Sequence, residues 1–177
     1  MVDWYNEAAA KISDLNPFAL TQTFNHVCVG QAEQCIATGL RVLDITRHRD
    51  GRAVTPVGTD ILDREDPNWR TAPPSTTPFH WASHAAPTKF YIYPLPADTV
   101  VLEGLSQKAP SPITRLTEDV EFPSDMAVIL TDYLAYRCLL EDAEDVTNQT
   151  LATEYLTKFE GAVIRQYRTE AKRRGIR

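Results

Sequence analysis

The sequence predicts an α+β protein, in which a helical bundle carries a small inserted antiparallel β-sheet or meander. Two long apolar runs with helical spacing lie between residues 122 and 172, and a shorter helical pattern opens the chain. Between them, short segments rich in β-branched and aromatic residues alternate with proline-containing turns. We therefore expect helices from about residues 1–20 and 122–172, and β structure from about 21–110.

The last third of the chain predicts a helical hairpin. Its first run follows Pro123-Ser124-Asp125, and an acidic stretch at residues 141–145 separates it from the second. Both runs repeat at i, i+3/i+4 and i+7/i+8, which is typical of an apolar stripe on one side of a helix. Neither helix can bury its stripe alone, so the two should fold against each other. The stripe residues are Met126, Ile129, Leu130, Tyr133, Leu134 and Leu140, then Leu151, Tyr155, Phe159, Ala162, Val163 and Tyr167.

The opening segment predicts a helix from Asp3 to Leu15, with Asp3 as its N-cap. Its pattern is Trp4, Ala8, Ile12, Leu15. Asn16-Pro17 should end this helix, because a residue before proline avoids the α region.

The central segment predicts mostly strands. Extended segments are expected at residues 21–29, 40–48, 79–83, 89–93 and 99–105, and a shorter apolar segment lies at 34–36. The last three extended segments are so closely spaced that antiparallel hairpins are favoured over βαβ crossovers. Thr55-Pro56 predicts the start of a short helix, with Thr55 as cap and Asp66-Pro67 as stop. Residues 71–78, rich in proline and hydroxyl side chains, predict a surface loop.

Composition indicates one soluble domain. The chain has 177 residues, of which 43% are apolar and 24% charged, values typical of globular proteins. No apolar run reaches the roughly 18–20 residues that span a bilayer, and the first residues lack the pattern of a signal peptide. We therefore expect no membrane partner, and a protein that stays in the compartment where it is made.

Positive charge is concentrated at the end of an acidic chain. The formal net charge of −6 argues against a protein that coats nucleic acid over its whole surface. Residues 165–177 nevertheless contain one acid, Glu170, and six bases: Arg165, Arg168, Lys172, Arg173, Arg174 and Arg177. Cations near a helix C-terminus complement the helix dipole. The same cluster also suits an acidic partner or a surface facing DNA, and the two interpretations are compatible.

No group of residues indicates catalysis, a cofactor or a metal. His80 and His84 are four residues apart, but on a strand their imidazoles would stand about 13 Å apart. His26 and Cys28 lack a local catalytic motif. The acidic runs at 118–121 and 141–145 lack the pattern of a calcium loop, and no nucleotide-binding or hydrolase motif is present. The sequence therefore predicts no enzyme.

The cysteines and aromatic residues favour packing roles. Cys28, Cys35 and Cys138 show no metal-type spacing, and their odd number excludes complete pairing within one chain. Buried thiols in a reducing compartment are the preferred interpretation. Adjacent Phe90 and Tyr91 point to opposite faces of a strand, so both faces are apolar. This suggests that something else, possibly another subunit, covers one face.

Several collinear segments resemble the head-to-tail adaptor proteins of short-tailed bacteriophages, also called head-tail connectors or tail tubular A-type proteins. These segments are residues 4–8, 40–47, 55–57, 62–63, 67–71, 89–94, 122–144 and 152–159. The resemblance implies a non-enzymatic virion protein that assembles in the host cytoplasm. It implies a ring, typically of twelve copies, between the portal protein and the tail nozzle protein. Packaged DNA would pass through that ring.

Contact sites follow from this resemblance as expectations. The basic residues Arg165, Arg168, Lys172, Arg173, Arg174 and Arg177 are assigned to the portal or to DNA. The subunit or nozzle interface is assigned to Trp69, Arg70, Pro73, Pro74, Trp81, Pro94, Leu95 and Pro96.

Two other functions stay open from the residues alone. The first is a cytoplasmic interaction module that binds a peptide or helix in a groove. The second is a small hydrolase of unfamiliar type that uses His80 or His84.

Overall fold

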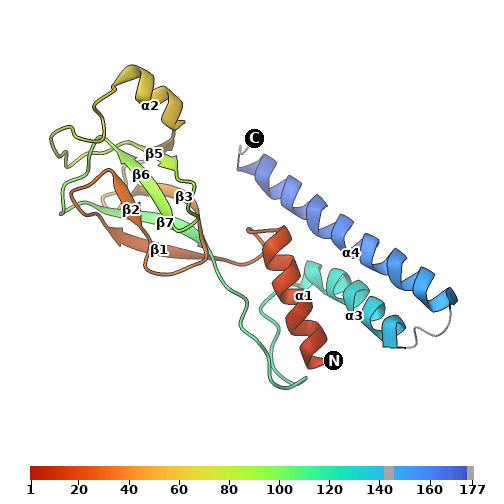
Figure 1. The fold of residues 1–177 in the computed structure, drawn as a ribbon. Helices are drawn as coiled ribbons and strands as arrows, with labels where there is room; N and C mark the ends of the chain where they lie inside the picture. Colours follow the sequence, from red (N-terminus) through yellow and green to blue (C-terminus); the bar gives the residue numbers. More distant parts are fainter. Residues whose placement is uncertain (142–145, 175–177) are drawn as a thin grey trace. The chain divides into compact units, whose positions relative to one another are not determined.

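The computed structural model describes residues 1–141 and 146–174, and the chain divides into two compact units (Figure 1). The helical unit comprises Met1–Leu20 and Ala109–Arg177, and the β unit comprises Thr21–Lys108. The long helices are segregated from the sheets in this way, with only the short helix of residues 59–65 in the β unit, which confirms the predicted α+β class. No helix among the described residues is long and apolar enough to cross a membrane.

The helical unit is built on the predicted hairpin. A 3-10 turn, η1 (Ser124–Met126), leads into α3 (Ala127–Glu141), which packs along α4 (Val146–Arg173). The opening helix α1 (Val2–Leu15) lies against both (Figure 1). Residues 142–145, which complete the predicted acidic stretch, lie outside the described residues.

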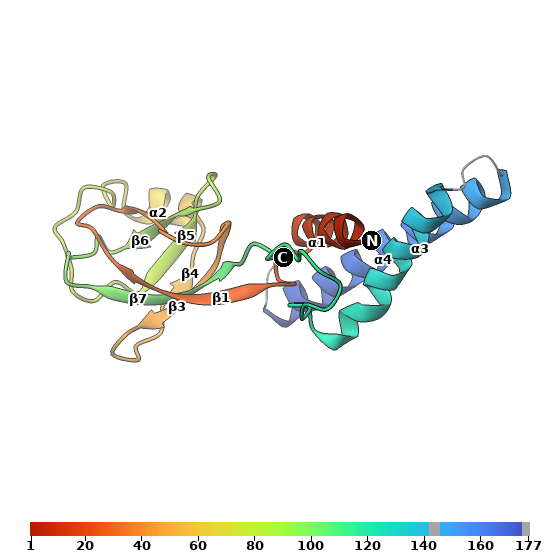
Figure 2. The ribbon, with the colours of Figure 1, turned by 90° about the horizontal axis from the view of Figure 1, so that it is seen from below.

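The predicted stripes are buried in the middle of the hairpin and exposed at its connected end. Tyr133 and Phe159 are fully buried, with ring centroids 4.9 Å apart, whereas Leu140 and Leu151 are 38% and 39% exposed. The reason is length: α1 has 14 residues and α4 has 28, so they span about 21 and 42 Å. The end joining α3 to α4 extends beyond α1 in both views (Figures 1 and 2).

The ends of α1 confirm one local prediction and correct another. Asn16 is the C-cap and donates its backbone N–H to Ile12 O at 2.8 Å before Pro17, as predicted. Asp3 is not the N-cap, because the helix already begins at Val2 after Met1. It lies within the first turn, where a carboxylate still favours the positive end of the helix dipole.

The β unit contains two sheets. The first has the order β1 (Thr21–Val27), β7 (Val101–Gln107), β3 (Arg41–His48), and all its pairs are antiparallel. The second has the order β2 (Glu33–Cys35), β6 (Lys89–Tyr93), β5 (His80–Ser83), β4 (Thr55–Pro56), and β4 joins it in parallel. The turn that follows β3 extends away from the sheets (Figure 2).

The predicted hairpins are confirmed for β5 and β6 but wrong for β6 and β7. β7 instead inserts between β1 and β3 in the other sheet. Gly104 explains how tightly β7 fits there: a Cβ on it would come within 2.6 Å of the Phe24 ring and 2.8 Å of Asp44 O. Phe24 and Asp44 are distant from Gly104 in sequence, so the position of β7 between β1 and β3 could not be predicted from neighbouring residues.

The predicted helix start at Thr55-Pro56 is also wrong. These residues form β4, and the amides of Thr55 and Val57 donate to Phe79 O and Trp81 O at 2.9 and 2.8 Å. The short helix α2 (Thr59–Glu65) begins three residues later, after Gly58. Asp66 ends it as predicted. Pro56 is tolerated because the neighbouring amides supply the hydrogen bonds at this sheet edge.

Both faces of β6 are covered by the same chain. Phe90 and Ile92 belong to a core cluster with Ile45 and Leu102 of the other sheet. Tyr91, on the opposite face, packs on a second cluster that includes Trp69 and Leu62. α2 and the segment after it thus bury the face that we expected another subunit to cover.

Candidate functional site

The end of α4 carries an exposed row of cations. Arg165, Arg168 and Lys172, called here the basic stripe, are spaced by three and four residues, so they share one side of the helix. All three are exposed, and none forms an ion pair within the described residues. Arg173, by contrast, pairs with Glu170 at 3.0 Å, and the Arg174 guanidinium lies 5.1 Å from the Phe18 ring centroid. Arg177 lies outside the described residues.

The helix dipole accounts for only part of this charge. α4 ends at Arg173, and the dipole acts mainly within the last turn. Lys172 and Arg173 lie in that turn. Arg165 and Arg168 lie before that turn, so the helix dipole does not explain their positive charge. They are the residues for which contact with another molecule is the better explanation.

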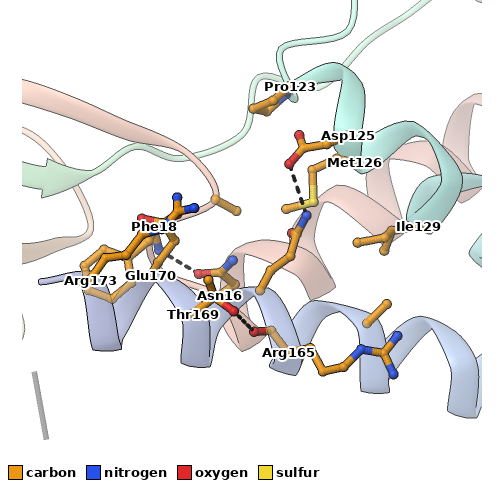
Figure 3. Close-up of a pocket in the computed structure, with 13 residues that line it drawn as sticks. Asn16, Phe18, Pro123, Asp125, Met126, Ile129, Arg165, Thr169, Glu170 and Arg173 are labelled. Atoms are coloured by element: carbon orange, nitrogen blue, oxygen red, sulfur yellow. Dashed lines mark hydrogen bonds and ion pairs between the residues drawn. The ribbon is translucent and has the colours of Figure 1, made fainter.

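A cavity of about 460 Å³ lies beside the stripe (Figure 3). We call it the α4 groove, and it opens where the C-terminal half of α4 passes the end of α1 and the start of α3. Its apolar lining comes from Phe18, Ala19, Met126, Ile129 and Ala162. Its polar lining on α4 comes from Arg165, Gln166, Thr169, Glu170 and Arg173. The groove can therefore accommodate a segment that is partly apolar and partly charged.

Local bonds fix the walls of the α4 groove. Phe18 stacks on Tyr167 with centroids 6.0 Å apart, and its N–H donates to Asn16 Oδ1 at 3.0 Å. Across the groove, Gln166 Nε2 donates a long bond of 3.4 Å to Asp125 Oδ2 (Figure 3). The guanidinium of Arg165 has no ionic partner among the described residues. Within the part of the chain that the structure describes, Arg165 and Asp125 are therefore the charged lining residues of this groove without an ion pair.

A family model described as "SU10 adaptor protein" matches residues 1–177, the entire chain. The chain belongs to the SU10 adaptor protein family. It is a structural adaptor protein of bacteriophages, a class that interacts with phage portal and tail proteins. This confirms the resemblance to head-to-tail adaptors. A search of curated proteins found no match.

The structure corrects four of the residues assigned to an adaptor interface. Trp69, Trp81, Leu95 and Pro96 are at most 8% exposed and belong to the interior of the β unit. Their burial removes them from any surface that could meet another subunit. The remaining four stay accessible: Arg70, Pro73 and Pro74 are exposed, and Pro94 is half-buried.

Arg70 differs from its buried neighbour Trp69 because it covers the indole from outside. Its guanidinium lies 4.2 Å from the Trp69 ring centroid and 2.5 Å from Asp63 Oδ1. That carboxylate also accepts the Trp69 Nε1–H at 2.8 Å, and the two bonds hold the pKa of Asp63 below its usual range. Arg70 thus covers the buried Trp69 indole from the solvent side and is also a candidate contact residue.

The adaptor's histidines each have a local partner. His80 Nδ1 lies 2.7 Å from Thr55 Oγ1, and His84 Nδ1 accepts the Ala86 N–H at 2.8 Å. His26 Nε2 lies 2.9 Å from Gln34 Oε1. Among the described residues, no cluster of three or more His, Cys, Asp or Glu side chains is arranged to hold a metal ion.

The expectation of buried thiols holds for one cysteine of three. Cys28 is 2% exposed, and burial raises its pKa to about 12, whereas Cys35 and Cys138 are exposed. We expect iodoacetamide at pH 8 to modify Cys35 and Cys138 and to leave Cys28 unmodified, because only a thiolate that the reagent can reach reacts. Peptide mass spectrometry of native and denatured samples measures this. Labelling of Cys28 at a rate similar to Cys35 in the native state would contradict it.

Sequence analysis missed the α4 groove and an exposed apolar turn in the helical unit. Three segments distant in sequence form the groove, so no local pattern marks it. Leu116 and Val120, which are 66% and 48% exposed, did carry a signal. They are large apolar residues inside a largely polar connection.

Proposed function

We propose that this adaptor forms a closed ring between the phage portal and the tail nozzle. The ring would contain about twelve copies, joined by a repeated heterologous interface that closes on itself. Packaged DNA would pass through its centre. The protein would assemble in the host cytoplasm and remain at the head-tail interface of the virion. The observation that carries this proposal is the family match over the whole chain.

The basic stripe supports a docking role. Arg165, Arg168 and Lys172 present three positive charges on one side of α4 without ionic partners among the described residues. Such a row favours an acidic protein surface or the phosphates of DNA, and it speeds the encounter with either. We assign the stripe to the portal or to DNA. Arg173 and Arg174 belong to the same proposed contact, and so does Arg177, which lies outside the described residues.

The accessible loops of the β unit support contacts with neighbouring subunits or the nozzle. Arg70, Pro73 and Pro74 lie on the exposed part of the segment after α2, and Pro94 is half-buried after β6. Proline-rich loops lose little conformational entropy when they bind, because their backbone is already restricted.

Native mass spectrometry of the purified protein, alone and mixed with portal rings, tests the proposal. We expect a species of about twelve copies, either alone or on the portal. A strict monomer or dimer that ignores the portal at micromolar concentration would contradict it. The α4 groove would then favour the second candidate, a cytoplasmic module that binds a peptide or helix.

A further inference from the structure

We propose that the loop of residues 113–121 of one adaptor copy docks in the α4 groove of the next copy. This Leu116 loop and the groove would be the two halves of a repeated subunit contact. The inference rests on the proposed ring, since it specifies how neighbouring copies are joined.

The Leu116 loop is a braced turn with an apolar tip. Asn6 of α1 holds its start by two hydrogen bonds with the backbone of Ile113, at 2.9 and 3.0 Å. The Thr114 hydroxyl donates to Glu118 Oε1 at 2.6 Å and closes the turn, and this bond holds the pKa of Glu118 below its usual range. Leu116 lies between them and is 66% exposed. A turn fixed in this way loses little entropy on docking.

The second brace lies at the end of the loop. Ser111 donates its hydroxyl and its N–H to the Glu121 carboxylate at 2.8 and 3.1 Å. Val120, just before it, is 48% exposed. The loop therefore displays two large apolar side chains that are exposed to a large extent, with hydrogen bonds on either side of them.

The charges of the loop match those of the groove. Leu116 is flanked by Arg115 on one side and by Asp119 three residues later, and both are exposed. The groove is lined by apolar Met126 and Ile129 together with Asp125 and Arg165, two charges that form no ion pair within the described part of the chain. In this contact Asp119 pairs with Arg165 and Arg115 with Asp125, while Leu116 covers the apolar lining. Arg168 and Lys172 are then the cations of the basic stripe that remain for the portal or DNA. Arg173 and Glu170 already pair with each other.

Leu116 does not occupy the groove of its own copy, because its side chain is 66% exposed and is not among the residues that line the groove. Asn6 anchors the loop near the start of α1, whereas Asn16, at the end of that helix, lines the groove. Ten residues of α-helix separate these two points by about 15 Å. We therefore assign the tip of the loop to the groove of another copy. Each copy would offer its loop to one neighbour and its groove to the other, which is the heterologous arrangement that a ring needs.

Disulfide cross-linking tests the contact directly. The variant carries Leu116→Cys and Thr169→Cys, with Cys35→Ser and Cys138→Ser to remove the exposed native thiols. A disulfide forms only when the two Cα atoms come within about 7 Å. On portal rings saturated with adaptor, we expect oxidation to link copies into dimers, trimers and longer chains. Either cysteine alone should give no product longer than a dimer.

Charge reversal in this cysteine background supplies a matched control. Arg165→Glu should lower the cross-linked fraction of portal-bound copies by about tenfold. Arg41→Glu, an equal change at an exposed residue of the β unit outside both the groove and the basic stripe, should leave that fraction unchanged. Adding Asp119→Arg to Arg165→Glu should restore it, which a merely structural effect of Arg165 would not do.

The outcomes separate the contact from the ring itself. Saturated wild-type rings of normal mass whose loop and groove cysteines do not cross-link would overturn the contact and leave the proposed function standing. A link from the groove cysteine to the portal or nozzle would also overturn it, and would assign the groove to that partner. Failure of the wild-type protein to form any ring would overturn both.

Discussion

Replacing Trp69 with alanine is expected to destabilise the β unit by about 3–5 kcal/mol. The indole is fully buried, lies edge-on to Tyr91 and Tyr93 at 5.5 and 6.4 Å, and donates its N–H to Asp63. Removing it leaves a large cavity on the outer face of β6. Because a domain is typically stable by only about 5–15 kcal/mol, this one change should bring the β unit close to unfolding. Urea denaturation followed by circular dichroism measures the effect.

Arg70→Ala is the matched control for Trp69→Ala. Arg70 is the next residue, contacts the same Asp63, and has a side chain that is 45% exposed. An exposed ion pair contributes little, so this variant should lose less than about 1 kcal/mol. If Trp69→Ala left stability unchanged and instead weakened subunit association, Trp69 would be a contact residue, as its sequence context had suggested.

The helical unit was largely predictable because its determinants are local. The spacing of Ile129, Tyr133, Phe159 and Val163 identifies the buried faces of α3 and α4 without knowledge of the rest of the fold. Asn16-Pro17 ends α1 through the steric effect of proline on the preceding residue. Where burial depends on a partner's length, as for Leu140 and Leu151, periodicity alone failed.

The β unit was less predictable because its pairings are long-range. Closeness in sequence correctly paired β5 with β6, but β7 pairs with β1 and β3, about 80 and 60 residues earlier. Thr55-Pro56 has the composition of a helix start, yet the carbonyls of the distant Phe79 and Trp81 recruit it as a strand. A tryptophan followed by an arginine suits an interface as well as a core, so only the fold could place Trp69.

The candidate site also has one part that could be predicted from local sequence and one part that depends on long-range contacts. The basic stripe was visible in the sequence, because its cations lie close together on one helix. What the sequence did not show is which cations are free: Arg173 pairs with Glu170, and Arg165 and Arg168 have no ionic partner among the described residues. The α4 groove depends on Phe18, Met126 and Arg165 coming together from three segments, and no sequence spacing records that.

Reversing two charges of the basic stripe, with Arg168→Glu and Lys172→Glu together, is expected to weaken docking to the portal by about a hundredfold. Both side chains are exposed and without ionic partners among the described residues, so the loss of stability should stay below about 2 kcal/mol, most of it from placing a carboxylate at residue 172 in the last turn of α4. Binding to immobilised portal rings at low and moderate salt measures the effect. Arg41→Glu with Arg49→Glu, an equal change at exposed residues of the β unit, is the control.

The same double variant decides between protein and DNA as the partner of the stripe. If the stripe faces DNA, duplex binding should fall and its salt dependence should weaken, since each lost phosphate contact lowers the slope of log K against log salt by about 0.9. Two contacts would lower it by about 1.8. If the stripe faces the portal, DNA binding should match that of the control variant while portal docking is lost. Unchanged binding to both partners would leave the helix dipole as the explanation for these cations, although Arg168 lies before the last turn of α4.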